Sequence, residues 1–456
     1  MQYLALLMIV TVTTVEYLAH GDKWGRVHVL PAQLSFLPEL LGAVALLCVI
    51  ALGMQNRFKF LRHAYWIVFG LLGFALVAGV IVNGVESGPI FAGIRNYFRA
   101  IPWFFVPAVF AFSEKQVRTQ LRVLLAICVL QVPVAIEQRI YTTNTYYGFE
   151  AVTGDWTIGT LNDSGVLSIF LVAAACVVVA LTIRQSLTKW QGLLLFLLLL
   201  VPTMINETKA TLVLLPFGIL VTFLCASRPG ARIKQLGVAL GLTAVFLALF
   251  VPTYNKLNEK REYGVSIGEF FLNSGNAEQY LLSNADVGTT VLVNRGDAMI
   301  VAVRETLKDP VRAAFGLGMG NASLSALGKN FAGRFSELYK NFLVIGFARF
   351  ILELGFLGFG LLLAVYWLIF QDARVVSRKG SGNKAALAAA WAGITVVMLL
   401  ALFYTRVETS APVSILFWYF SGLIAAERAR LASPHAASEP VSAAESESFS
   451  ARRAAA

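Results

Sequence analysis

Charged residues are scarce in this chain, and their scarcity excludes an ordinary soluble protein. Only 14% of the 456 residues are charged, whereas 57% are hydrophobic. Soluble domains carry about 25% charged residues, so a chain this apolar needs lipid to cover much of its surface. Helices satisfy their own backbone hydrogen bonds inside a bilayer. The composition therefore predicts an all-α, polytopic integral membrane protein.

Cysteine and histidine are also rare, which removes the usual disulfide and metal chemistry. The four cysteines all fall in apolar segments and lack metal-ligand spacing, so we expect neither disulfides nor a zinc site. The four histidines lie outside the long polar segment described below, so no metal and no cofactor is expected. The formal charge of +11 is spread over short loops between apolar runs. Membrane topology explains that distribution, and we expect no nucleic-acid partner.

Twelve apolar runs approach the length of about 20 residues that a membrane-spanning helix needs. They cover residues 2–19, 31–53, 64–82, 100–113, 121–138, 164–183, 190–204, 210–226, 235–252, 350–370, 386–403 and 411–426. The fourth run is short and contains Pro102 and Pro107. Breaks in a helix are tolerated at membrane depth only where protein or a wet cavity covers the backbone. We therefore expect an interfacial or broken helix at this run.

These runs divide the chain into four parts. Residues 1–252 hold the first nine predicted spans, and residues 346–427 hold the last three. Between them, residues 253–345 form one large polar loop with amphipathic helices. Residues 428–456 are mostly Ala, Ser, Glu and Arg, a composition typical of a disordered tail.

Basic residues predict how the chain is oriented. They gather in alternate short loops, the first of which holds Arg57, Lys59 and Arg62, while the intervening short loops mostly hold single ones. The positive-inside rule then places both termini in the cytoplasm and the large loop 253–345 outside, because long loops are translocated largely regardless of their charge.

Arg349 and Glu353 lie one helical turn apart at the start of a predicted span. An ionisable group at bilayer depth costs about 2.5–3.5 kcal/mol on insertion scales and usually faces a cavity or a partner. One interpretation is a structural ion pair between positions i and i+4. The other is a functional pocket, and the sequence leaves both open.

The large loop adds further candidates. Arg295 begins a segment with apolar residues four apart, typical of an amphipathic helix, which also carries Arg304. After Pro310 comes a glycine-rich turn with Gly316 and Gly318, whose backbone amides could approach an anion. The alternative is that both arginines are solvated surface charges and the turn is structural.

Two shorter outside loops contain polar residues beside aromatic ones. Between the fifth and sixth runs, Arg139 precedes an aromatic stretch that ends in Asn162 and Asp163, a combination that suits a sugar ring or an interfacial aromatic belt. Between the seventh and eighth runs lie Glu207 and Lys209. Lys209 is either an anion ligand or a lysine that extends to the lipid headgroups.

The order of these motifs resembles the O-antigen ligase and O-antigen polymerase superfamily of bacterial polysaccharide-assembly proteins. The resemblance covers roughly residues 140–370. It is carried by Gly159-Thr-Leu-Asn162 before a span, Thr208-Lys209-Ala210 at the next turn, Arg295 through Asp309-Pro310 to Gly316-Leu-Gly318, and Glu353-Leu-Gly355-Phe-Leu-Gly358. Each motif is short, and their order around one large outside loop gives the resemblance its specificity.

The resemblance implies metal-independent glycosyl transfer from polyprenyl-diphosphate-linked oligosaccharides at the periplasmic face of the bacterial inner membrane. It also implies membrane lipid as a partner, together with a flippase and a chain-length regulator. Two positions differ from the family pattern. Lys209 stands where the family has an arginine, and no histidine lies near Val344–Arg349, where the ligases have one.

This resemblance assigns roles to the candidate residues. Arg295, Arg349 and Glu353 are the predicted catalytic residues, and the predicted substrate-binding residues are Lys209, Arg139, Asn162, Asp163, Glu207, Arg304, Gly316 and Gly318. A diphosphate leaving group needs fixed cations, and an acceptor hydroxyl needs a carboxylate base, for which Glu353, Glu207 and Asp163 all remain open.

The predicted function is a polysaccharide polymerase-like glycosyltransferase acting on O-antigen, capsule or exopolysaccharide repeat units. Three alternatives stay open. One is a ligase that transfers glycan to a lipid acceptor. Another is a flippase or transporter for the lipid-linked oligosaccharide, in which the same cations line a path through the bilayer. The last is a structural subunit, which would tolerate the loss of individual arginines.

Overall fold

The structure is a computed structural model. It describes residues 1–21, 29–57, 61–145, 156–161, 163–227, 230, 232–259, 266–272, 285–287, 290–292, 294–325 and 327–432. Asn162 lies outside these residues, as do much of the predicted large loop and the tail beyond residue 432. The expectations for those parts of the chain stay predictions.

Most of the described residues are helical. The helices are α1 Gln2–His20, α2 Leu37–Leu52, α3 His63–Val82, α4 Ser87–Phe98, α5 Ile101–Val109, α6 Glu114–Thr145, α7 Ser164–Ile183, α8 Lys189–Ile205, α9 Thr211–Ala226, α10 Arg232–Asn258, α11 Ile267–Leu272, α13 Arg295–Thr306, α14 Pro310–Phe315, α15 Ser336–Tyr339, α16 Gly346–Lys379, α17 Gly382–Ala401 and α18 Ala411–Ala432. Two short strands, β1 Ala285–Val287 and β2 Thr290–Leu292, pair antiparallel with Ala285 opposite Leu292.

Eight of the described helices are long and apolar enough to cross a membrane: α1, α2 with its flanking turns, α3, α6, α7, α10, α16 and α17. The protein is therefore an α-helical membrane protein. Each of the twelve predicted runs coincides with a helix. Of the remaining four, α8 and α9 are apolar but shorter, with 17 and 16 residues. Helix α18 has 22 residues but is not among the eight. At the fourth run, α5 has only nine residues and contains Pro107, as the prolines predicted.

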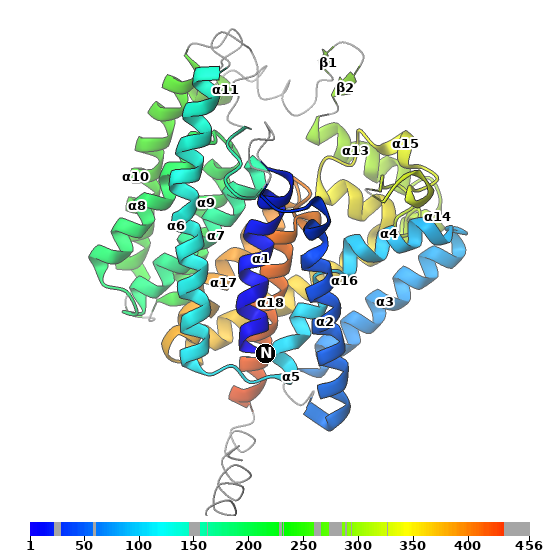
Figure 1. The fold of residues 1–456 in the computed structure, drawn as a ribbon, viewed down its shortest axis with the longest axis horizontal. Coiled ribbons are helices and arrows are strands. Elements are labelled where there is room, and N and C mark those ends of the chain that lie inside the picture. The colour runs from blue at the N-terminus through cyan, green and yellow to red at the C-terminus, as the bar shows by residue number, and fades with distance from the viewer. Residues whose placement is uncertain are drawn as a thin grey trace, which may run out of the picture.

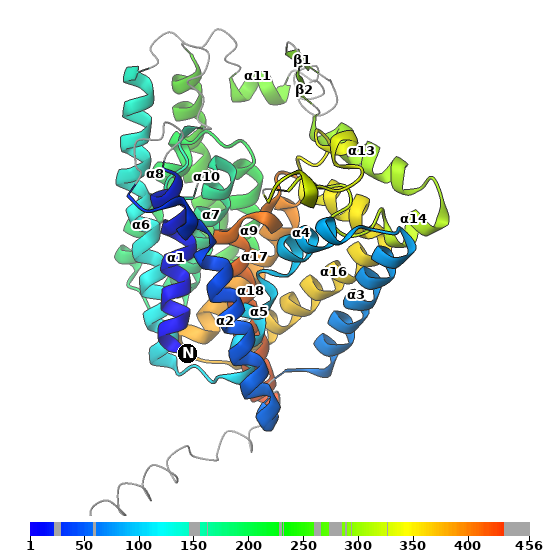
Figure 2. The same cartoon turned by 45° about the vertical axis from the view of Figure 1, so that its right-hand side comes forward.

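Both ends of the described chain lie at the same end of the helical bundle. Figures 1 and 2 show the N-terminus and the last turns of α18 at this end, and α11, the two strands and α13 at the opposite end. The bundle is organised around α17, which packs against α7, α9 and α16, while α18 packs against α5. We call residues 259–345, between α10 and α16, the long connection.

The long connection packs against the first half of α16. Ala298 and Ala302 of α13 form a small separate core with Ile351 and Leu352 of α16, together with other apolar residues. Both α13 and α14 lie against α16 (Figure 2). The predicted amphipathic helix that begins at Arg295 is α13. Its buried residues are Ala298, Ala302 and Thr306, whereas Leu307, four residues beyond Val303 on the predicted apolar face, is 61% exposed.

An interruption at Gly355 divides α16 into two halves. The φ and ψ angles of Gly355 are 66° and −173°, a backbone conformation that is essentially restricted to glycine. At the end of the first half, the Ile351 carbonyl accepts a hydrogen bond from the Thr306 hydroxyl at 3.2 Å. The Leu352 carbonyl accepts one from the Leu317 amide at 2.7 Å. Protein groups therefore satisfy carbonyls that the broken helix leaves open, as non-helical backbone in a membrane protein requires.

Close packing explains why the predicted anion-binding turn contains Gly316 and Gly318. Gly316 has a φ of 66°, and a Cβ atom there would lie 2.6 Å from the Leu352 carbonyl oxygen. Gly318 has a φ of 90°, and its Cβ would lie 3.0 Å from the Gly79 carbonyl oxygen of α3. The turn thus fits between α16 and α3, and this packing accounts for both glycines without an anion.

We expect Gly355→Ala to lower the stability of the protein by about 1–3 kcal/mol, the usual cost of a residue held in such a backbone region. The added Cβ would also lie 2.5 Å from the Gly316 nitrogen. Gly360→Ala is the matched control, because Gly360 lies on the same helix and a Cβ there meets no atom within 4 Å. Thermal unfolding of the purified proteins measures the difference. Equal midpoints for both variants would contradict the packing described here.

Candidate functional site

A cavity of about 210 Å³ lies where α4, the long connection, α16 and the α17–α18 connection meet. Among the described residues, every charged side chain that lines it is cationic: Arg95, Lys340, Arg349 and Arg406. The polar neutral lining residues are Asn96, Ser323, Ser325 and Thr409. Four cations from four separate segments, with neutral hydrogen-bonding groups between them, make a site suited to an anion that also carries hydroxyl groups.

Arg349 is the most buried of the four cations. It lies on the first half of α16, and its side chain is only 5% exposed. Its guanidinium is 3.8 Å from the Glu353 carboxylate and 3.8 Å from the Glu408 carboxylate. The guanidinium carbon also lies 5.2 Å from the centre of the Tyr97 ring, a favourable cation–π distance. The structure therefore contains the predicted i,i+4 pair and also directs Arg349 to a cavity.

Glu353 is fully buried, and both of its carboxylate oxygens are occupied. Oε2 accepts a hydrogen bond from the Tyr97 hydroxyl at 2.5 Å, and Oε1 accepts one from the Ala322 amide at 3.2 Å. Because Glu353 does not line the cavity, this geometry favours a role in holding Arg349 and the glycine-rich turn over the predicted role of general base.

Glu408 is a second buried acid beside Arg349, and it belongs to none of the sequence motifs described above. It lies in the connection between α17 and α18, in the short turn Val407–Thr409. Its side chain is 9% exposed. Neither of its carboxylate oxygens accepts a hydrogen bond from another residue in the described part of the chain. Burial raises the pKa of Glu408, and the nearby Arg349 guanidinium opposes that rise.

The other cations of the cavity differ in how they are neutralised. Arg95 lies 2.8 Å from the Glu39 carboxylate, and Lys340 lies 2.7 Å from the Glu337 carboxylate. Arg406 is exposed, and no carboxylate of the described residues lies within ion-pair distance of it. Arg406 is therefore the cation whose charge is least compensated by the protein.

Arg295 and Arg304, which were predicted to act with Arg349, do not line this cavity. The Arg295 Nε donates a hydrogen bond to the Tyr404 carbonyl at 2.9 Å, and its guanidinium lies 4.4 Å from the centre of the Tyr404 ring. These contacts fasten the start of α13 to the α17–α18 connection. Arg304 is exposed on α13. Arg295 therefore contacts Tyr404 and not the cavity. Of the three predicted catalytic residues, the structure brings together only Arg349 and Glu353.

Four more predicted residues lie elsewhere, around neighbouring ends of the helices α6 to α10. Arg139 forms an ion pair with Glu207 at 2.8 Å, and Glu207 has a left-handed backbone with a φ of 57°. The Lys209 ammonium lies 5.9 Å from the centre of the Tyr254 ring. Asp163 accepts a hydrogen bond from the amide of Val166, 2.8 Å away, and so caps α7. None of these four predicted residues contributes to the lining of the cationic cavity.

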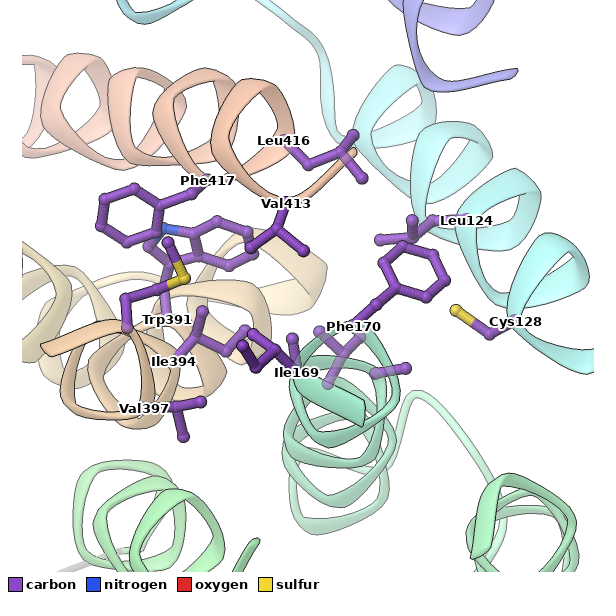
Figure 3. A pocket seen from close by; sticks show the side chains of 14 residues that line it. Leu124, Cys128, Ile169, Phe170, Trp391, Ile394, Val397, Val413, Leu416 and Phe417 are labelled. Carbon is purple, nitrogen blue, oxygen red and sulfur yellow. The ribbon is translucent and has the colours of Figure 1, made fainter. Parts of the chain in front are cut away.

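Two smaller cavities are apolar. One lies between α6, α7, α17 and α18, and Figure 3 shows that Trp391, Phe417 and Phe170 are among the side chains around it. The other, of about 40 Å³, adjoins the cationic cavity, since Asn96 lines both. Its wall is largely aliphatic and aromatic, with Tyr97 and Glu408 at one side.

Comparison of the chain with protein-family models finds no match, and comparison with curated proteins finds none at the level of significance required.

Three of the four lining cations were missed because each is an ordinary loop or interfacial charge in the sequence. For Arg95, the one available signal was its position just before the proline-containing fourth run. Lys340 and Arg406 lie in segments far from it along the chain, and only the fold brings the three together.

Proposed function

We propose that this protein is a polysaccharide polymerase-like glycosyltransferase of the O-antigen ligase and polymerase superfamily. It joins polyprenyl-diphosphate-linked oligosaccharide repeat units of an O-antigen, capsule or exopolysaccharide. The observation that carries the proposal is the cavity lined by Arg95, Lys340, Arg349 and Arg406. A diphosphate that leaves an anomeric carbon gains negative charge, and fixed cations in a partly dry site stabilise that charge.

The surroundings of the cavity suit an amphiphilic substrate. A polyprenyl diphosphate has an anionic head and a hydrocarbon chain, so its site needs cations beside apolar surface. The cationic cavity and the neighbouring apolar cavity share Asn96, and the apolar one is bounded by α3 and α16 residues such as Leu72 and Leu362. This arrangement supports a headgroup in the first cavity and the first isoprene units in the second.

The reaction needs little from the protein beyond positioning and charge. An acceptor hydroxyl of one repeat unit attacks the anomeric carbon of another, a glycosidic bond forms, and the bond to the diphosphate oxygen breaks. The electron pair leaves with the diphosphate, and each new bond releases one proton. The Arg349 guanidinium presents a planar pair of donors to phosphate oxygens. Arg406, Arg95 and Lys340 add charge around it.

We further propose that the protein lies in the bacterial inner membrane with both termini cytoplasmic, the long connection periplasmic and about twelve membrane segments. The N-terminus and the last turns of α18 lie at one end of the bundle, and α11 and α13 lie at the opposite end (Figure 1). This arrangement supports the proposed orientation. Helices α8 and α9 are shorter than about 20 residues, and local thinning of the bilayer accommodates such lengths. The broken pair α4 and α5 makes the fourth segment.

The glycan profile of a strain that lacks this protein tests the function. We expect single repeat units on the carrier lipid, or single units capped onto the final acceptor, because polymerisation is the missing step. Complementation with the intact chain should restore long polymer. The structural-subunit alternative predicts that single-residue variants of the cavity also restore it.

The alternatives give different profiles in the same experiment. Loss of a ligase leaves long polymer attached to the carrier, and loss of a flippase leaves repeat units on the cytoplasmic face of the membrane. Either of these profiles would contradict the proposed polymerase.

A further inference from the structure

One guanidinium faces two buried carboxylates beside the cationic cavity. Arg349 lies 3.8 Å from Glu353 and 3.8 Å from Glu408, and the three side chains are at most 9% exposed. With both acids ionised, the trio carries one excess negative charge. Burying an uncompensated charge is costly, so such a cluster favours the protonation of one acid.

The hydrogen bonds distinguish the two acids. Glu353 accepts hydrogen bonds from the Tyr97 hydroxyl and from the Ala322 amide, and these contacts hold its carboxylate in place. Glu408 accepts no hydrogen bond from another residue in the described part of the chain. Burial also raises the pKa of Glu408. Glu408 is buried and accepts no hydrogen bond from another described residue, so it is the acid that we expect to take up a proton.

The charged and titratable groups that act on Glu408 come from three segments. From α16 they are Arg349, Glu353 and Tyr366, from α4 Tyr97, and from its own connection Arg406. Arg349 and Arg406 are the cations of this set, and both line the cationic cavity. A bound anion therefore competes with Glu408 for the same two positive charges.

We propose that Glu408 is a positioning residue of the diphosphate site, which holds the Arg349 guanidinium while the cavity is empty and takes up a proton when a diphosphate replaces it. This inference rests on the proposed function of the cavity. Nearby negative charge disfavours an ionised carboxylate, so anion binding promotes protonation of Glu408. Linkage is reciprocal, so protonation of Glu408 promotes anion binding, and the affinity rises as the pH falls.

Calorimetric titration of the purified full-length protein in lipid nanodiscs, with inorganic diphosphate as the ligand, measures this proton directly. Titrations in buffers with different heats of ionisation give the number of protons taken up per anion bound. We expect uptake by the unmodified protein beyond the ionisation of the diphosphate itself. We also expect its affinity to change by up to about tenfold per pH unit, the limit for one linked proton.

Glu408→Gln has the shape of the acid without a titratable proton. It should keep diphosphate binding and lose both the extra proton uptake and the associated pH dependence. Glu408→Asp should restore them, which a purely structural role would not require. Glu337→Gln is the matched control, because Glu337 pairs with another cavity cation, Lys340, and is 76% exposed. It should behave like the unmodified protein.

Two results would overturn the proposal and are distinguishable from each other. Diphosphate binding with the same proton uptake in the unmodified protein and in Glu408→Gln overturns the role of Glu408 alone. Absence of diphosphate binding to the unmodified protein overturns the diphosphate site as well, and with it the observation that carries the proposed function.

Discussion

Arg349→Gln is expected to lower polymer formation by about a hundredfold or more, the usual effect of removing one donor that stabilises a developing anion. Arg349 is the most buried cation of the cavity, and its guanidinium is already fixed by Glu353, Glu408 and the Tyr97 ring. Arg349→Lys should also lose most activity, because an ammonium cannot make the paired, planar contacts of a guanidinium. Polymer length in a complemented deletion strain measures both effects.

A matched variant separates loss of function from loss of the fold. Arg304→Gln removes an exposed arginine of α13 that does not line the cavity, so it should leave polymer formation unchanged. Breaking a buried ion pair can also cost about 3–5 kcal/mol of stability, so the membrane level of each variant must be measured beside its activity. Normal polymer with both Arg349→Gln and Arg349→Lys would remove Arg349 from the site.

The second large effect is expected from Arg406→Gln. Arg406 lines the cavity but is exposed and lies within ion-pair distance of no described carboxylate. Its replacement should leave the thermal unfolding midpoint unchanged while activity falls by about ten- to a hundredfold. A contact between a charged donor and an anion is worth about 1.5–3 kcal/mol, which corresponds to that range. Unchanged activity at an unchanged midpoint would exclude Arg406 from substrate binding.

The helices could be located from the sequence because hydropathy reports burial in lipid directly. All twelve predicted runs coincide with helices, and the prolines at the fourth run marked the short α5. Helix ends were less accurate. The run 121–138 belongs to α6, which extends from Glu114 to Thr145, because polar residues at both ends continue the helix beyond the apolar core.

The site was predictable only where two of its residues lie on one helix. Arg349 and Glu353 stand out because charges one turn apart are unexpected in an apolar segment. Arg95, Lys340 and Arg406 reach the same cavity from three other segments, and no local pattern links them. The role of Glu408 depends on its distance from Arg349, which sequence separation does not reveal.

Several predicted residues proved to have local structural contacts that the sequence could not distinguish from ligand binding. Asp163 caps α7, and Arg139 pairs with Glu207. Gly316 and Gly318 allow a turn to pack closely against two helices. In each case the residue type suits a ligand and also suits a neighbouring group of the protein. Only the three-dimensional arrangement shows which protein group is the partner in the folded chain.

Polymerisation by the purified protein tests the central claim most directly. The protein would be reconstituted in liposomes with the carrier-linked repeat unit that accumulates in the deletion strain as the only glycan substrate. We expect a ladder of longer carrier-linked products, with one polyprenyl diphosphate released for each bond formed. The combined variant Arg349→Lys with Arg406→Gln should form no ladder. An equally long ladder from that variant, or no ladder from the folded unmodified protein, would contradict a polymerase that acts through the cationic cavity.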